Sequence, residues 1–134
     1  MSQESKFLYV EDDPISREVM QLMLQGLGYS QVTLLDSSVE FMARIQALPS
    51  VPDVIFLDIH MQPHDGFEML ARLREHPVFA AKNIIAVTAS VMNEEVQRLR
   101  DAGFDGAIGK PLDFENFAPL IERVLRGEPI WHIV

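Results

Sequence analysis

Short apolar runs alternate along this chain with longer segments in which apolar residues recur at helical spacing. The runs typical of strands cover residues 7–10, 31–35, 54–57, 84–87 and, more weakly, 106–109. The run at 54–57 is apolar throughout, as expected for a strand buried on both faces of a parallel sheet. Five strand–helix repeats of this length predict an α/β fold, in which five helices cover the two faces of a five-stranded parallel sheet.

Proline and glycine mark several of the predicted helix ends. Pro14 stands in the first turn of the first helix, where a missing backbone N–H costs nothing, and Gly28 suits the end of that helix. Pro119 interrupts the last helical pattern, so we expect the final helix to begin near Ala118, after a looser turn.

Charged and hydroxyl side chains directly follow four of the five apolar runs. Glu11 and Asp12 follow the first, Asp58 the third, Thr88 the fourth and Lys110 the fifth. Because ligands of open α/β sheets bind outside the carboxyl ends of the strands, we expect these side chains to meet in one crevice. Carboxylates with a single lysine suit Mg²⁺ and a phosphoryl group rather than an apolar substrate.

Composition narrows the classes of protein that fit. With 134 residues, the chain predicts one domain over 1–134, with a core of about 6–126, a short tail at 127–134 and no output domain. The net charge of −9 argues against nucleic-acid binding, which needs a basic surface. There is no cysteine, signal peptide or apolar stretch of the ~18 residues that a membrane helix requires, so we expect a cytoplasmic protein that does not bind membranes.

Several short motifs occur together, in one order, over most of the chain. They are Tyr9-Val10-Glu11-Asp12-Asp13-Pro14, Leu57-Asp58-Ile59-His60-Met61, Asp65-Gly66, Val87-Thr88-Ala89 and Gly109-Lys110-Pro111. With these motifs the chain resembles the response-regulator receiver domains of two-component signalling, of the chemotaxis-regulator type, from Phe7 to about Leu125. The resemblance implies a flavodoxin-like, doubly wound sheet with strand order 2-1-3-4-5.

The resemblance also implies a Mg²⁺ site in the crevice. Asp12 and Asp58 would bind the ion directly, Glu11 would bind it through water, and the backbone carbonyl of His60 would supply a further ligand. This set suits Mg²⁺, which keeps several waters and uses few carboxylates.

The remaining crevice residues would serve phosphorylation. By the resemblance, Asp58 accepts a phosphoryl group as an acyl phosphate, Lys110 pairs with a phosphoryl oxygen, and the Thr88 hydroxyl moves towards another oxygen. The protein would then be a regulatory phospho-acceptor and no enzyme beyond Mg²⁺-dependent self-phosphorylation and slow autodephosphorylation. The Lys110-Pro111 bond is expected to be cis, as in the family.

The implied partners are proteins. A sensor histidine kinase or a phosphotransfer protein would donate the phosphoryl group, and an unidentified target protein would bind a stand-alone receiver that is a monomer or weak dimer. The tail at 127–134 carries the apolar residues Ile130, Trp131, Ile133 and Val134. We expect the tail to pack on the domain, although a partner-docking strand is an alternative.

Two positions depart from the family pattern. The order Met61-Gln62-Pro63 differs from the usual Met-Pro and alters the loop path, and Ala107 replaces an aromatic residue that changes its rotamer in many relatives. Without that ring, we expect the response to phosphorylation to concentrate at residues 88–92.

Three other functions remain as alternatives. A phosphate-independent docking module is the strongest, because Ala107 removes a known switch residue. A flavodoxin-like electron carrier is disfavoured because Glu11, Asp12 and Asp13 would repel a cofactor phosphate. A Mg²⁺-dependent phosphohydrolase would have a second acid two residues after its nucleophile, where this chain has His60.

Overall fold

The computed structural model describes residues 4–89 and 92–132, and its elements alternate between strand and helix along the chain. They are, in order, β1 (Phe7–Val10), α1 (Pro14–Gly26), β2 (Val32–Leu35), α2 (Phe41–Gln46), β3 (Val54–Asp58), α3 (Gly66–Glu75), β4 (Asn83–Thr88), α4 (Asn93–Ala102), β5 (Gly106–Gly109), α5 (Phe114–Leu125) and β6 (Ile130–His132). The five predicted helices are therefore present.

The strands form one parallel sheet in the order β2-β1-β3-β4-β5-β6. The expected order of the first five strands is confirmed, and the prediction of a five-stranded sheet is wrong. The sixth strand comes from the tail, whose three-residue strand is too short to stand out from the sequence as a strand.

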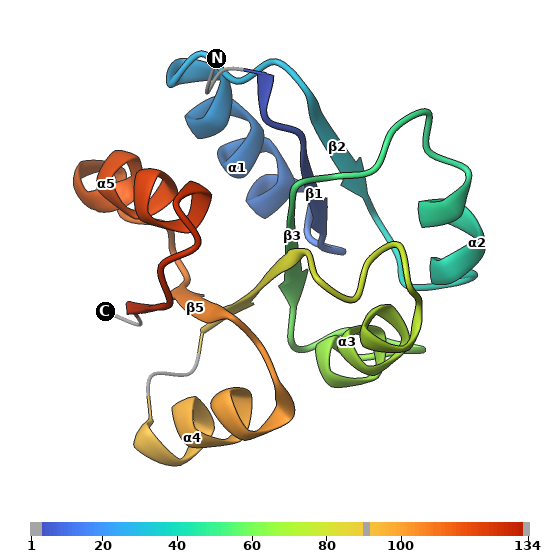
Figure 1. Cartoon of the computed structure of the whole chain (residues 1–134). Coiled ribbons are helices and arrows are strands. Elements are labelled where there is room, and N and C mark those ends of the chain that lie inside the picture. The colour runs from blue at the N-terminus through green and yellow to red at the C-terminus, as the bar shows by residue number, and fades with distance from the viewer. Residues whose placement is uncertain (1–3, 90–91, 133–134) are drawn as a thin grey trace.

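The tail packs on the domain, as expected, over the part that is described. Strand β6 pairs with β5 so that Ile130 lies beside Gly106 and Trp131 beside Ala107, and Figure 1 shows this dark red segment next to β5. Ile130 is fully buried. A Cβ atom on Gly106 would lie 2.4 Å from the carbonyl oxygen of Ile130, so β6 approaches this closely because residue 106 is a glycine. Residues 133–134 lie outside the described part.

The helices cover the two faces of the sheet (Figure 1). Helices α2, α3 and α4 bury Phe41, Met69 and Leu99 against one face. Helices α1 and α5 bury Leu24 and Ile121 against the other. The core thus has two apolar layers, and the loops at the carboxyl ends of the strands are left to carry polar groups.

Helix α5 begins at Phe114, so the expectation of a start near Ala118 is wrong. The Asp113 side chain caps the helix by accepting a hydrogen bond from the N–H of Glu115 at 3.0 Å. Pro119 lies inside the helix, which costs about 3 kcal/mol in an ordinary helix interior. Four buried apolar side chains offset this cost, namely Phe117, Leu120, Ile121 and Val124.

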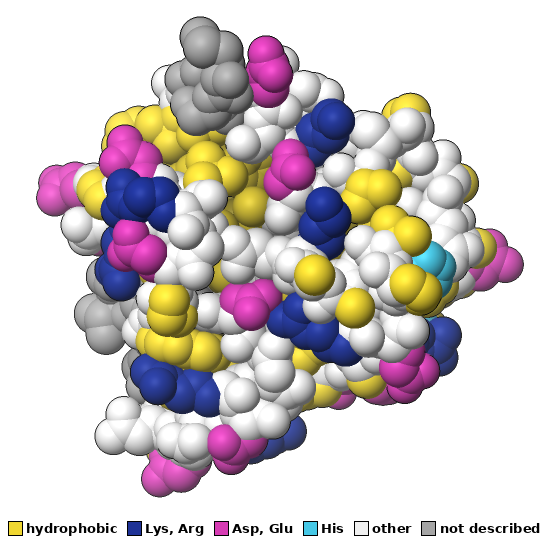
Figure 2. Space-filling view, in the orientation of Figure 1, with side chains coloured by type: hydrophobic (Ala, Val, Ile, Leu, Met, Phe, Trp, Pro, Cys, Tyr) yellow, Lys and Arg dark blue, Asp and Glu magenta, His cyan; other side chains and the backbone are white. Residues whose placement is uncertain are grey.

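Two further observations concern the surface. No helix in residues 4–89 and 92–132 combines the length and apolar character needed to cross a membrane. On the face drawn in Figure 2, acidic and basic side chains are interspersed among those described.

Candidate functional site

The polar residues predicted from the strand ends do lie together. In the sheet, Val10 lies beside Leu57, Asp58 beside Val87, and Thr88 beside Gly109. The residues that follow β1, β3 and β5 therefore leave the sheet together, at the carboxyl ends of its strands. Carboxylate oxygens of Glu11, Asp12 and Asp58 lie within 4.8 Å of one another.

Glu11 is buried and has several hydrogen-bond donors around it. Its Oε1 accepts hydrogen bonds from the Tyr9 hydroxyl at 2.7 Å and from Lys110 Nζ at 2.8 Å. Its Oε2 accepts one from the backbone N–H of Asp13 at 3.2 Å, and its carbonyl accepts one from Arg17 at 2.8 Å. A buried carboxylate needs such partners, and here they also hold the loop after β1 in place.

Lys110 connects the first and third strand ends. Its Nζ lies 2.8 Å from Glu11 Oε1 and 3.5 Å from Asp58 Oδ1. Burial alone would lower the pKa of the lysine, but Glu11 and Asp58 outweigh it and raise that pKa. Lys110 is therefore a stable cation directly beside Asp58. The Lys110-Pro111 peptide bond is cis, as the resemblance implied, and so is Gln62-Pro63.

The two buried carboxyl groups titrate differently. Burial, together with the neighbouring Glu11, raises the pKa of Asp58 to about 7. Burial also acts to raise the pKa of Glu11, but hydrogen bonds with Asp58, Lys110 and Tyr9 reverse the effect and lower that pKa. In the absence of a cation, the pair therefore holds a proton on Asp58 to unusually high pH.

The neighbouring acids have distinct positions. Asp13 accepts hydrogen bonds from the N–H and hydroxyl of Ser16 and so caps α1. Asp12 is exposed as a residue, but partial desolvation of its carboxyl group and the neighbouring Glu11 raise its pKa. Of the two, only Asp12 belongs to the carboxylate cluster.

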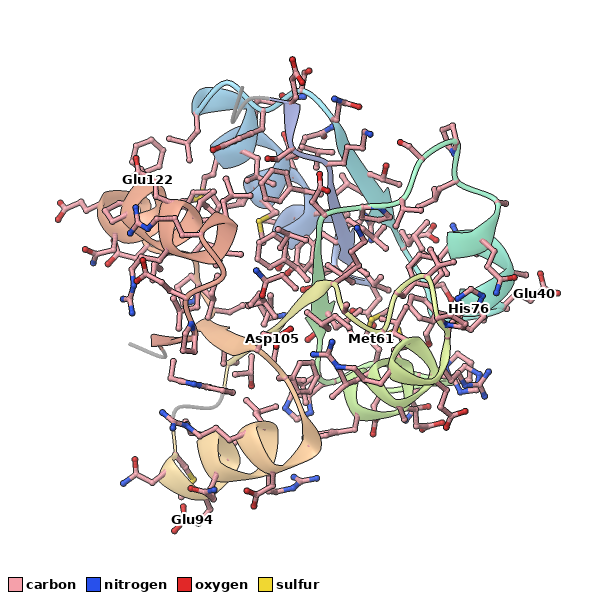
Figure 3. All side chains as sticks on the ribbon, in the orientation of Figure 1. Glu40, Met61, His76, Glu94, Asp105 and Glu122 are labelled. Atoms are coloured by element: carbon pink, nitrogen blue, oxygen red, sulfur yellow. The ribbon has the colours of Figure 1, made fainter. Side chains whose placement is uncertain are left out.

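A cavity of about 620 Å³ opens beside Asp12. Its lining includes His60 and Met61 of the loop after β3, the second of which is labelled in Figure 3, and Glu95 and Arg98 of α4. The cavity gives a ligand access to the carboxylate cluster from the side of α4.

His60 and Thr88 both lie at this edge of the sheet. The backbone N–H of His60 donates to Asp58 Oδ1 at 3.3 Å. Thr88 is fully buried at the end of β4, and its carbonyl accepts a hydrogen bond from the Lys110 N–H at 2.8 Å. The segment 88–92, where the sequence predicts the largest response, includes residues 90–91, which lie outside the described residues.

Sequence reasoning missed several residues of the site. Tyr9 stands two residues before Glu11, and strand alternation could have placed their side chains on the same side. Arg17, Glu95 and Arg98 reach the site or its cavity from helices. Their sequence context carries no signal for this, because helix orientation decides which side chains reach the crevice.

The cluster fits a hard divalent cation. Its three carboxylates converge within 4.8 Å. Burial and the neighbouring Glu11 raise the pKa of Asp58, and a bound cation would favour the ionised form of that carboxyl group. Oxygen ligands of this kind are those that Mg²⁺ prefers in proteins.

Comparison with known proteins gives a consistent result. Residues 7–122 match the family described as response regulator receiver domain. An uncharacterised 14.6 kDa protein of Leptolyngbya boryana is 32% identical over 122 residues, which cover 91% of each chain. The nitrate/nitrite response regulator protein homolog of Haemophilus influenzae is 30% identical over 138 residues, covering 97% of this chain and 61% of that protein.

A solved structure of a response regulator has the same fold. The chemotaxis response regulator CheY4 of Vibrio cholerae superimposes with a TM-score of 0.80 at 27% identity, over 90% of this chain and 98% of that one.

Proposed function

This chain belongs to the response regulator receiver domain family of two-component signal transduction, and on that basis we propose that it is phosphorylated on Asp58. Phosphorylation and Mg²⁺ binding are general properties of this family. The observation that carries the proposal is the position of Asp58, within 4.8 Å of two other carboxylates and 3.5 Å from the Lys110 ammonium.

The proposed reaction is phosphoryl transfer from a phosphohistidine. A carboxylate oxygen of Asp58 attacks phosphorus, and an O–P bond forms as the P–N bond breaks. The leaving imidazole nitrogen keeps the electron pair and takes up a proton. Lys110 offsets the negative charge that gathers on the phosphoryl oxygens, and the Thr88 hydroxyl would bond one of those oxygens in the product.

A bound Mg²⁺ would supply charge neutralisation between the carboxylates and the phosphoryl group. We assign Asp12 and Asp58 as its direct ligands, Glu11 as a ligand through water and the His60 carbonyl as a further ligand. Asp12 supports this assignment, because it is the exposed member of the cluster and lines the cavity.

The donor would be a sensor histidine kinase or a phosphotransfer protein, and the output would be binding to a target protein. Phosphorylation adds roughly −1.5 to −2 charge at one end of the sheet, which can bias a two-state segment. We further propose that the protein acts as a stand-alone receiver in the cytoplasm. The match over 91% of a 14.6 kDa relative supports the stand-alone assignment.

Mass spectrometry can test the phosphorylation site. After incubation with acetyl phosphate and Mg²⁺, the intact protein should gain one phosphoryl group that hydroxylamine removes, as expected for an acyl phosphate. Asp58→Asn should gain none, because an amide oxygen is a poor nucleophile.

Asp65→Asn is the matched control. Asp65 is a nearby acid that caps α3 through the N–H of Glu68, and asparagine caps helices as well as aspartate does. This variant should label like the native protein. Undiminished labelling of Asp58→Asn would contradict the assignment, and the absence of label from the native chain would favour a phosphate-independent docking module.

A further inference from the structure

Helix α4 is held to the body of the protein by few contacts. Leu99 is its one fully buried side chain, and Glu94 at its start points away from the sheet in Figure 3. Two arginines of the helix lie over aromatic rings of other elements. Arg98 lies 4.7 Å from the centroid of Phe67, and Arg100 lies 4.7 Å from that of Trp131. Elements with few buried apolar contacts are the ones that open or shift most readily.

The ring under Arg100 belongs to β6, the strand that the tail adds to the sheet. Trp131 pairs with Ala107, which in turn pairs with Ala86. The two alanines leave room on this face, and the half-buried indole packs against the apolar layer beneath α4. The Trp131 ring therefore touches the sheet on one side and α4 on the other.

Strand β6 is itself firmly anchored. Ile130 is fully buried in the opposite apolar layer, beside Gly106. In the exposed turn that precedes the strand, the Glu128 carboxylate forms ion pairs with Arg126 at 2.7 Å and with Arg123 at 3.4 Å. A well-anchored strand that contacts a loosely held helix can restrain that helix.

Short connections link this contact to the candidate site. Thr88 is the last residue of β4, and α4 begins a few residues later, at Asn93. Lys110 follows β5, the strand between β4 and β6, and its N–H binds the Thr88 carbonyl. Movement at the phosphoryl group would thus reach α4 and β6 together.

We propose that β6 is a strap that holds α4 in its unphosphorylated position through the contact between Trp131 and Arg100. This inference rests on the proposed function. A contact made in one conformation only shifts the equilibrium towards that conformation. The strap therefore opposes phosphorylation, and releasing it makes the phosphorylated conformation easier to reach.

The test compares labelling rates of full-length variants. Arg100→Ala removes the cation but leaves β6 intact, because Arg100 is exposed on the helix. Its rate of labelling by phosphoramidate and Mg²⁺, followed by intact mass, should rise roughly two- to fivefold, the range expected for an exposed cation–π contact. Arg100→Lys, which keeps a cation, should label at a rate between those of the native protein and Arg100→Ala.

Two controls distinguish the loss of the contact between Trp131 and Arg100 from an unspecific effect of removing an arginine. Arg72→Ala removes an exposed arginine of α3 and should label at the native rate. Trp131→Ala should label as fast as Arg100→Ala, and the double variant no faster than either, because both changes remove one contact. A lower melting temperature of Arg100→Ala with an unchanged labelling rate would make the contact merely structural and overturn the proposal.

Trp131 also provides a direct readout, since it is the only tryptophan of the chain. Beryllofluoride with Mg²⁺ should shift its emission to longer wavelength and increase its quenching by acrylamide, and Asp58→Asn should show neither change. Native emission that stays constant, together with equal labelling rates, would overturn the strap. A native chain that takes no label at all would contradict the proposed function instead.

Discussion

At the scale of single residues, Glu11 organises the site more than its sequence context suggests. Tyr9 and Lys110 share its Oε1, Asp13 binds its Oε2, and Arg17 binds its carbonyl. The acids and the lysine at the strand ends could be predicted because their positions relative to apolar runs are visible in the sequence. Tyr9 reads as an ordinary core residue, and Arg17 as a surface one, because their contacts depend on the paths of a loop and a helix.

Tyr9→Phe should lower the free energy of unfolding by about 1.5–3 kcal/mol, the range for a hydrogen bond to a charged group. The hydroxyl lies 2.7 Å from a carboxylate oxygen of fully buried Glu11, so no water readily replaces it. Urea denaturation measures the loss. Tyr29→Phe, at a buried tyrosine outside the site, should cost clearly less, and an equal cost would show that the Glu11 contact adds nothing.

Asp58 should make the stability of the metal-free protein depend on pH. Its pKa rises from the ordinary 3.8 to about 7 on folding. The contribution of protonated Asp58 to the free energy of unfolding is therefore fully present below pH 3.8 and is lost as the pH rises to 7. The loss is at most roughly 4 kcal/mol. Glu11, whose folded-state pKa is lowered, contributes in the opposite sense, but only below its ordinary value of 4.5.

Thermal unfolding in EDTA between pH 5 and pH 8 tests this dependence. The native protein should lose stability over that range, and Asp58→Asn should be nearly flat and more stable than the native protein at pH 8. Parallel pH profiles for the two proteins would mean that Asp58 titrates normally.

At the scale of elements, the sequence predicted the repeating strands and helices but not the start of α5 or the strand β6 that follows it. The strand over 54–57 agrees with β3 because a continuous apolar run marks a buried strand, and the weaker strand over 106–109, predicted from its place in the repeat, agrees with β5. Strand β6 has only three residues and gains its stability from the edge of β5, which a local pattern cannot show. The start of α5 was placed too late because buried apolar contacts outweigh the cost of Pro119.

Gly106→Ala should displace β6 from the sheet. The added methyl group would lie 2.4 Å from the Ile130 carbonyl oxygen, and a backbone atom cannot move aside without breaking the pairing. Overpacking of this kind costs about 1–3 kcal/mol. Amide hydrogen exchange should show faster exchange at residues 130–132, with β1 and β3 unchanged.

Gly26→Ala is the matched control, because a Cβ at Gly26 meets no atom within 4 Å. This variant should retain native exchange at β6. Full protection of β6 in Gly106→Ala would contradict the close approach described above.

At the scale of the whole molecule, the sheet joins side chains from distant parts of the sequence into one charged edge. Glu11 and Lys110 are 99 residues apart in sequence and bond at 2.8 Å. Periodicity alone could not order the strands, and the order came from the resemblance to a family. The sixth strand and its contact with α4 come from the tail and lie beyond what that resemblance implied.

Mg²⁺ should raise the melting temperature of the protein, because the folded state alone brings the three carboxylates together. At ~100 times the dissociation constant, a ligand specific for the folded state adds about 2.7 kcal/mol. The gain should be larger at pH 8 than at pH 5, because the cation must displace the proton from Asp58. Differential scanning fluorimetry with Mg²⁺ titrations measures both effects.

Asp12→Ala should abolish most of this response, whereas Asp13→Ala should keep it despite losing the cap of α1. An equal Mg²⁺ response in Asp12→Ala and the native protein would place the ion elsewhere.

The close approach of β6 to Gly106 turns one position into a marker for comparing related sequences. Any larger residue there would collide with the Ile130 backbone, so a relative can add a sixth strand in this register only if it has a glycine at the matching position. An apolar residue matching Ile130 and an aromatic one matching Trp131 complete the signature. Sequences that carry all three should share the six-stranded sheet, and those with a side chain at position 106 should leave the edge of the fifth strand open to other chains.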